Sequence, residues 1–282
     1  MSKSNIIIQG DVNTGKSRSL ITLLDEYVDE RDKWHNGAGQ QVALIGIEAN
    51  AEVALGRNLC NRQRPGGIHY HYIPSVAITW AQYKSWMSII NNMPIEKALE
   101  VQDPNRRQCR QLLDVIDSCN AFTCDICGED FGDMAEWGDD WTACLDGLTG
   151  LTTIARHLCV GMKPILSRPD YNPVMGAVEN FLDLWWGATK CNTVLLSHVD
   201  REVSPITGTT SITIHTIGQK LAPRLVKKPD EIITTTYDEG RYFWHTELPG
   251  QITKTRRMPR GVDFEPDFSK YSLFTQETVN VE

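Results

Sequence analysis

A glycine-rich stretch near the start of the chain has the spacing G-x-x-x-x-G-K-S. Glycines at these positions let backbone N–H groups close around phosphate oxygens. The lysine of such a stretch reaches the β- and γ-phosphates of a nucleotide, and the serine hydroxyl binds Mg²⁺. We therefore expect a nucleoside triphosphate and Mg²⁺ to bind here, at Gly10, Asp11, Val12, Asn13, Thr14, Gly15, Lys16 and Ser17, followed by Arg18.

The residues on both sides of this stretch predict the elements that position it. The apolar run Ile6–Ile8 precedes it and Leu20–Leu24 follows it, which is the order strand, turn, helix. A helix that starts at Ser17 favours anions at its N-terminus. We expect this helix to continue through the charged run 25–33, as far as the Gly-Ala-Gly break at 37–39.

Two carboxylates stand at the ends of expected strands. Residues 41–48 form a buried parallel strand that ends in Glu48, and a shorter apolar strand from Trp141 ends in Asp146. Ligands of open α/β sheets bind at the carboxyl ends of strands. Glu48 is thus expected either to orient a water that attacks the γ-phosphate or to be an ordinary solvated acid. Asp146 is expected to hold Mg²⁺ through water; Asp114 and Asp117 compete for that role, but their spacing is helical.

A further buried strand, 191–198, follows an expected helix from about 173 to 190 and ends in Ser197 and His198. His198 could sense the γ-phosphate, or it could be a hydrogen-bonded histidine at a strand end. The segment 200–218 is rich in Ser, Thr, Gly and Pro, so we expect a mobile loop on the nucleotide side of the sheet.

Residues 68–73 alternate aromatic and aliphatic residues with histidines and predict a third strand, which precedes a helix over 76–92. His69 and His71 share one face of this strand. Because no carboxylate or cysteine stands at ligand spacing beside them, the sequence favours a strand with one polar face, and we assign these histidines no chemistry.

The alternation of expected strands and helices stops over residues 93–138, which we interpret as an insertion. Within it, Cys124-x-x-Cys127-Gly has the geometry of a zinc knuckle. Structural zinc needs four ligands, and the sequence has no second C-x-x-C. Cys109 and Cys119 could complete a Zn²⁺ site, and free reduced cysteines are the alternative.

The C-terminal part predicts strands at 230–237 and 241–247, which form a hairpin, and a third at 251–257. On that third strand Lys254 and Arg256 would emerge on one face, either as a solvated edge or as fingers that point at a neighbouring subunit's phosphates. We expect one domain over 1–260 and a tail over 261–282 that is an irregular packed strap or partly disordered.

Composition bounds the class of protein. The chain has 282 residues, 41% of them hydrophobic, and a net charge of −8, so we expect one sizeable soluble domain whose contacts with nucleic acid come from local basic patches. No apolar run of about 18 residues occurs, and the first residues run directly into a strand, so we expect no membrane span, no signal peptide and a cytoplasmic protein. Eight cysteines then indicate reduced thiols or metal ligands.

In its order of elements, residues 5–260 resemble the RecA-like core ATPases, and most of all the compact phage-encoded AAA-type members that act in single-strand annealing and recombination. The resemblance implies that Glu48 is the catalytic base, that Asp146 serves Mg²⁺ and that His198 is the polar group at the strand end. Lys254-Thr255-Arg256 matches the Lys-x-Arg pair that in KaiC-like proteins reaches the neighbouring subunit's site. The cysteine-containing insertion departs from the common core, and 200–218 carries only Arg201 as a cation.

These observations predict an α/β fold with a RecA-like P-loop NTPase core: a twisted, mainly parallel sheet flanked by helices, with a C-terminal β-hairpin. The expected function is Mg²⁺-dependent ATP hydrolysis on DNA, with single-stranded DNA favoured. The protein would act as a homo-oligomeric ring or filament in the cytoplasm. If a phage encodes it, this is the cytoplasm of the host. ATP is preferred over GTP because no N-K-x-D motif occurs. The alternatives are a DNA-packaging or other translocating motor and a structural or regulatory subunit that binds nucleotide without turnover.

Overall fold

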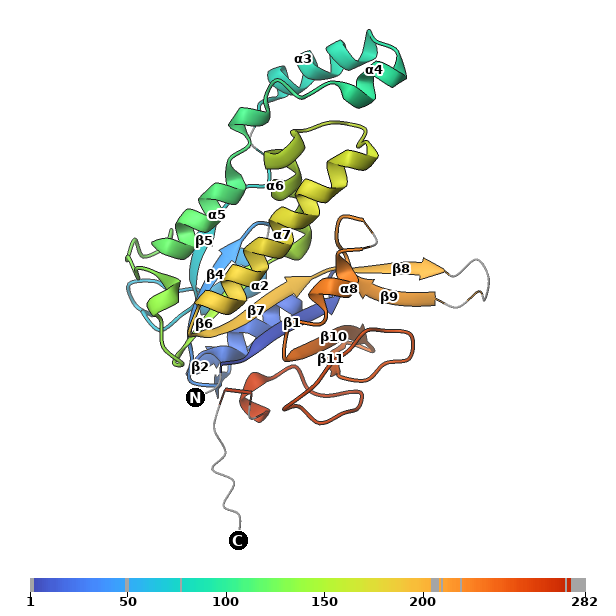
Figure 1. The fold of residues 1–282 in the computed structure, drawn as a ribbon. Coiled ribbons are helices and arrows are strands. Elements are labelled where there is room, and N and C mark those ends of the chain that lie inside the picture. The colour runs from blue at the N-terminus through green and yellow to red at the C-terminus, as the bar shows by residue number, and fades with distance from the viewer. Residues whose placement is uncertain are drawn as a thin grey trace.

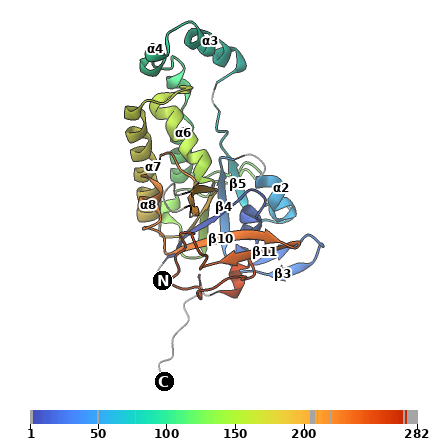
Figure 2. The same ribbon diagram turned by 90° about the vertical axis from the view of Figure 1, so that its right-hand side faces the viewer.

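A seven-stranded sheet lies at the centre of the computed structural model, which describes residues 3–48, 51–76, 78–203, 208, 210–218, 220–271 and 273–274. Its strand order is β11-β10-β1-β7-β6-β4-β5, and every pair is parallel except β10 with β11. This confirms the expected mixed α/β architecture with a mainly parallel sheet flanked by helices (Figures 1 and 2). The strands are β1 Asn5–Gly10, β4 Gln41–Gly46, β5 His69–Tyr72, β6 Trp141–Asp146, β7 Asn192–Ser197, β10 Glu231–Asp238 and β11 Arg241–His245.

Both faces of the sheet are buried, which explains the nearly continuous apolar sequence of its strands. In β1, Ile7 packs into one apolar core, while Ile6 and Ile8 pack into a second core on the opposite face of the sheet. The second core also contains Leu20 and Leu23, which follow the glycine-rich stretch. The sheet is therefore held between two apolar layers.

The helices cover the two faces unequally. On one face lie α5 Gln111–Asn120, α6 Leu148–Val160 and α7 Arg168–Ala188, and on the other lie α1 Lys16–Ser19, η1 Leu20–Leu23 and α2 Ala51–Leu55. Helices α3 Trp80–Asn91 and α4 Ile95–Glu100 extend beyond the sheet (Figures 1 and 2). The remaining short elements are η2 Gly56–Asn58, η3 Arg106–Gln108, η4 Met134–Glu136, α8 Ala222–Leu225 and η5 Phe268–Lys270.

The long helix α7 begins earlier than the sequence predicts, and Pro173 lies inside it. A capping box explains the earlier start: the Ser167 side chain and the Asp170 side chain each bond the other's backbone, and a proline occupies one of the first two helical positions. The pattern 173–190 captured only the apolar part of this helix.

The expected helix through residues 25–33 is wrong. Helical structure ends at Leu23, and a small antiparallel hairpin follows, formed by β2 Glu26–Val28 and β3 Trp34–Asn36. The carboxylate of Asp29 accepts hydrogen bonds from the backbone N–H groups of Arg31 and Lys33, and this local bonding stabilises a turn instead of a helix.

The segment 200–218 also differs from the expected mobile loop. It forms part of an antiparallel hairpin, with β8 Val199–Val203 paired to β9 Thr210–Ile214. The backbone N–H of His215 then bonds the carbonyl of His198, which fixes the hairpin to the end of β7. The positions at the tip, 204–207 and 209, lie outside the described residues.

At the C-terminal end, β10 and β11 form an antiparallel pair joined through Glu239 and Gly240, both at positive φ. The strand expected over 251–257 is not formed, since this segment makes only isolated bridges at Gln251 and Lys254. The chain then packs as an irregular strap, in which Phe268 is fully buried against Trp244. Within the described part of the chain, no helix combines the length and apolarity that crossing a membrane requires.

Candidate active site

The register of the parallel strands brings their carboxyl ends together. Asp146 at the end of β6 pairs with Gly46 of β4 and with Leu196 of β7. On the other side of β7, Ser197 pairs with Gln9 of β1. The residues that follow these strands therefore converge at one edge of the sheet, next to the glycine-rich stretch.

The glycine-rich stretch, residues 10–17, is called the phosphate-binding loop here because of its sequence. A Cβ on Gly10 would stand 2.3 Å from Thr235 Oγ1, and one on Gly15, whose φ is +85°, would stand 2.7 Å from the ring of Tyr242. The Thr14 hydroxyl lies 2.8 Å from the carbonyl of Asp11 and 2.7 Å from Thr235 Oγ1. The loop is thus packed against β10 and β11 and has a defined conformation.

Lys16 lies inside the loop, although the sequence predicts a side chain that reaches the β- and γ-phosphates. It is 8% exposed, and its Nζ donates to the carbonyls of Gly10 at 3.0 Å and Asp11 at 2.7 Å. Burial lowers the pKa of Lys16, while the carboxylates of Asp146 and Glu48 favour its charged form. The ammonium group is held by two carbonyls that phosphate oxygens could replace.

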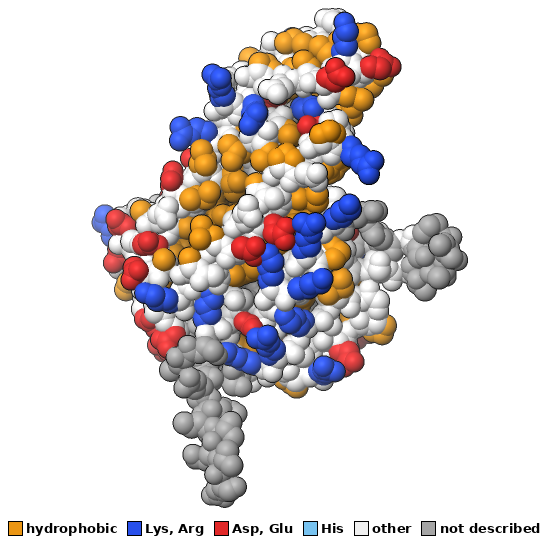
Figure 3. Space-filling view, viewed as in Figure 1, with side chains coloured by type: hydrophobic (Ala, Val, Ile, Leu, Met, Phe, Trp, Pro, Cys, Tyr) orange, Lys and Arg blue, Asp and Glu red, His pale blue; other side chains and the backbone are white. Residues whose placement is uncertain are grey.

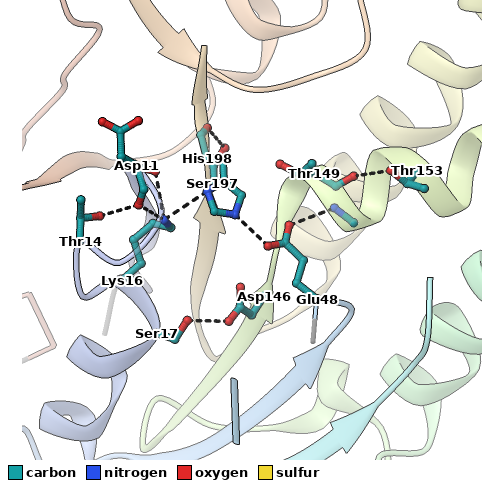
Figure 4. Close-up of polar contacts among 12 residues, drawn as sticks. Asp11, Thr14, Lys16, Ser17, Glu48, Asp146, Thr149, Thr153, Ser197 and His198 are labelled. Carbon is teal, nitrogen blue, oxygen red and sulfur yellow. Dashed lines mark hydrogen bonds and ion pairs between the residues drawn. The ribbon is translucent and has the colours of Figure 1, made fainter. Parts of the chain in front are cut away.

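Ser17 and Asp146 form a direct contact across the floor of the site. The Ser17 hydroxyl donates to Asp146 Oδ2 at 2.7 Å (Figure 4). Burial raises the pKa of Asp146 to about 6, and the adjacent charge of Glu48 acts in the same direction. A hydroxyl and a carboxylate held together are the hard oxygen donors that Mg²⁺ prefers, so these two residues fit the expected ion.

His198 connects Glu48 to the phosphate-binding loop (Figure 4). Its Nε2 lies 2.9 Å from Glu48 Oε2, and its Nδ1 lies 3.4 Å from Lys16 Nζ. Since the lysine ammonium can only donate, Nδ1 accepts and Nε2 carries the proton toward Glu48. The backbone N–H of Gly150 reaches the other Glu48 oxygen at 3.2 Å. Burial raises the pKa of Glu48. The contact with His198, the Gly150 N–H and the charge of Lys16 together outweigh this effect, so the net pKa is lowered.

These groups line a pocket of about 730 Å³, a size suited to a nucleotide-sized ligand. Two residues of this region were missed by sequence reasoning. Tyr242 lines the pocket beside Gly15, and no motif marks it, because it reaches the loop only through the pairing of β11. Arg201 forms a two-pronged ion pair with Asp11 of the loop; its position as the only cation early in 200–218 was the one available signal.

The other residues proposed from sequence lie elsewhere in the chain. Arg256 Nη1 pairs with Asp230 Oδ1 at 2.6 Å, and Lys254 Nζ donates to the carbonyls of Lys227 and Pro229. Asp230 bonds Asn5 at the amino end of β1, whereas the phosphate-binding loop follows the carboxyl end. Without a strand at 251–257, nothing places Lys254 and Arg256 on one face by strand alternation. Asp114 and Asp117, the rivals of Asp146, are exposed on α5.

The residues expected to accompany Cys124 and Cys127 are different in the structure. Cys124 and Cys127 lie together, but Cys60 and His69 stand beside them, in place of Cys109 and Cys119. Cysteines do lie beside His69 in the fold. Spacing along the chain did not indicate them, because these residues are far apart in the sequence. His71 is paired with Asp125.

Comparisons with known proteins assign the chain to no family. No protein-family model matches the chain, and no curated protein matches it. Among solved structures, it is similar to an ATPase from the type III secretion system of pathogenic bacteria, with 13% sequence identity and a TM-score of 0.39. The match covers 83% of this chain and 52% of that structure, so the chain spans about half of its length.

Proposed function

We propose that this protein is a RecA-like, Mg²⁺-dependent ATPase that works on single-stranded DNA as a homo-oligomer. The observation that carries the ATPase part is the continuous set of contacts from Ser17 and Asp146, through the phosphate-binding loop and Lys16, to His198 and Glu48. One edge of the sheet thus supplies a cation for phosphates, oxygen donors for a metal ion and a carboxylate for water.

Each residue has a separable task in this proposal. Lys16 leaves the loop carbonyls and binds the β- and γ-phosphates, while Ser17 and Asp146 would hold Mg²⁺. When bound, Mg²⁺ neutralises negative charge on those phosphates. Glu48 orients the attacking water, and His198 fixes the Glu48 carboxylate through Nε2–H. Because His198 also contacts Lys16, it couples the position of Glu48 to the position of the lysine.

The DNA and assembly parts rest on the resemblance in element order and on surface charge. With a net charge of −8, the chain can contact phosphates of nucleic acid only through local groups of cations. Lys and Arg side chains gather toward α8, below a helical layer with many hydrophobic side chains (Figure 3). In that region Arg224 and Lys227 are exposed.

The test is the ATP hydrolysis rate with no DNA, with single-stranded DNA and with duplex DNA, measured beside Lys16→Ala. Stimulation by single strands that Lys16→Ala abolishes is the expected result. Stimulation by duplex alone would replace the proposal with a translocating motor. Nucleotide binding without turnover in all three conditions would replace it with a structural or regulatory subunit. Equal nucleotide binding by Lys16→Ala and the parent would exclude this stretch as the nucleotide site.

A further inference from the structure

Four side chains with metal-binding atoms meet beside the edge of the sheet, away from the candidate active site. Cys60, His69, Cys124 and Cys127 each offer one ligand atom, and these atoms all lie within 4.8 Å of one another. We propose that this group, named here the Cys₃His cluster, is a structural Zn²⁺ site. The proposal is independent of the nucleotide chemistry.

The distances fit tetrahedral zinc. With Zn–S bonds of about 2.3 Å, the ligand atoms of a tetrahedral site stand roughly 3.8 Å apart. Cys60 Sγ lies 3.3 Å from Cys124 Sγ, and Cys127 Sγ lies 3.6 Å from His69 Nδ1. Three thiolates and one imidazole are an established donor set for structural zinc, and a closed set of four leaves no open position for a substrate.

The backbone around Cys124 is built as a zinc knuckle. The N–H groups of Tyr70 and Ile126 point at Cys124 Sγ, at 3.3 and 3.4 Å. The chain from 122 to 132 folds back on itself, with Gly128 at a φ of +74° in the turn that follows Cys127. Amide donors aimed at a sulfur stabilise the thiolate form, which is the form that binds metal.

The surroundings exclude water from most of the cluster. Cys60, Cys124 and His69 are 1%, 1% and 6% exposed, and only Cys127 faces solvent. The His69 ring packs against Phe131, with 4.2 Å between ring centroids, and this contact sets the orientation of the imidazole. The cluster therefore combines three buried ligand residues with one cysteine at the surface.

The position of the cluster indicates what zinc would do. Its ligands come from the segment before β5, from β5 itself and from the knuckle between α5 and β6, so a single ion would join three separate segments. β5 is an edge strand, and Asp125 of the knuckle covers it: the Asp125 N–H bonds the Tyr70 carbonyl, and its carboxylate accepts from Tyr72 N–H. Zinc would therefore hold the insertion against an otherwise open sheet edge.

The test uses the full-length protein, purified in reductant without chelator, with metal measured by mass spectrometry. We expect about one equivalent of zinc, lost in Cys60→Ser and Cys124→Ser. Cys109→Ser and Cys119→Ser are the matched controls: both are cysteines outside the cluster, and both should keep the zinc. Retention of a full equivalent in both Cys60→Ser and Cys124→Ser would overturn the ligand set.

Two further measurements do not depend on whether buried variants fold. The exposed Cys127→Ser should bind zinc more weakly in a competition with a chromophoric chelator. Cobalt substituted into the parent should give the absorption of a tetrahedral ion with thiolate ligands. A parent protein without metal that takes up neither Zn²⁺ nor Co²⁺ in reductant would exclude the site. So would a disulfide between Cys60 and Cys124 in protein handled without oxidant.

Discussion

At the scale of single residues, the contact between Glu48 and His198 separates two explanations of the site. An ordinary solvated acid would need no protein partner, yet both Glu48 oxygens are bonded, one by His198 and one by Gly150 N–H. Holding a carboxylate by both oxygens fixes its direction, which is what positioning a water requires.

We therefore expect Glu48→Gln to bind ATP like the parent and to hydrolyse it about 10²–10⁴-fold more slowly, since an amide keeps the shape of the carboxylate but cannot accept a proton. Nucleotide affinity by fluorescence and turnover by phosphate release measure the two effects. Glu52→Gln, an exposed glutamate four residues away, is the control and should leave both unchanged. Parent-like turnover in Glu48→Gln would transfer the role to another carboxylate.

His157 provides a test of stability against pH. It is 2% exposed, and burial, aided by the charge of Arg156, lowers its pKa from 6.5 to about 4. The unfolded chain then binds a proton between these values that the folded chain does not, so the stabilising contribution is complete above pH 6.5 and is lost as pH falls toward 4. We expect a loss of about 2 kcal/mol from this residue at pH 5 relative to pH 8.

Chemical denaturation at both pH values measures this loss in the parent. In His157→Gln the difference between pH 8 and pH 5 should shrink by that amount. An identical pH dependence in His157→Gln and parent would show that the buried imidazole does not control this slope.

At the scale of elements, the hairpin β8–β9 brings a cation to the phosphate-binding loop. Arg201 follows His198 by three residues, so the end of β7 delivers both side chains to the site. Arg201 and Asp11 are 53% and 48% exposed, and surface pairs of this kind contribute little to folding because solvent screens them. Arg201 should instead affect nucleotide affinity, because it neutralises the charge of Asp11 beside the proposed phosphate site.

We expect Arg201→Ala to weaken nucleotide affinity roughly three- to tenfold, since Asp11 then repels the triphosphate. Asp11→Asn in the same variant should restore most of that affinity, and the thermal midpoint should change little throughout. Arg224→Ala is the control. Arg224 lies on α8, and it also pairs with an acidic side chain, that of Glu179. If Asp11→Asn fails to compensate, the coupling between these two residues is absent.

The elements also show what the sequence could and could not predict. Buried strands and their strand-end residues were predicted well, because an apolar run such as that before Asp146 has one stable place in a parallel sheet. The hairpin at 26–36 was missed because its turn depends on the bonds of a single carboxylate, that of Asp29. His69 was missed because its cysteine neighbours are brought to it by tertiary structure, which spacing along the chain does not encode.

At the scale of the whole molecule, Arg256 is too far from its own phosphate-binding loop to act on it, since it is anchored by Asp230 at the opposite end of β1. If Arg256 serves catalysis, it acts on a neighbouring subunit, as the resemblance to Lys-x-Arg proteins implies. Its side chain is 67% exposed, so its pair with Asp230 adds less than about 1 kcal/mol to stability and can be broken without unfolding the chain.

The assembly proposal then predicts that Arg256→Ala binds nucleotide like the parent but loses turnover at concentrations where the parent is oligomeric, since a finger acting in trans contributes about 10³–10⁵ in rate. Asp230→Asn removes the anchor but keeps the cation, and it should therefore retain turnover. Mixing Arg256→Ala with Glu48→Gln should restore part of the activity, because some interfaces then combine an intact Glu48 with an intact Arg256. Undiminished hydrolysis by Arg256→Ala alone would reduce Arg256 to an anchor of the C-terminal strap.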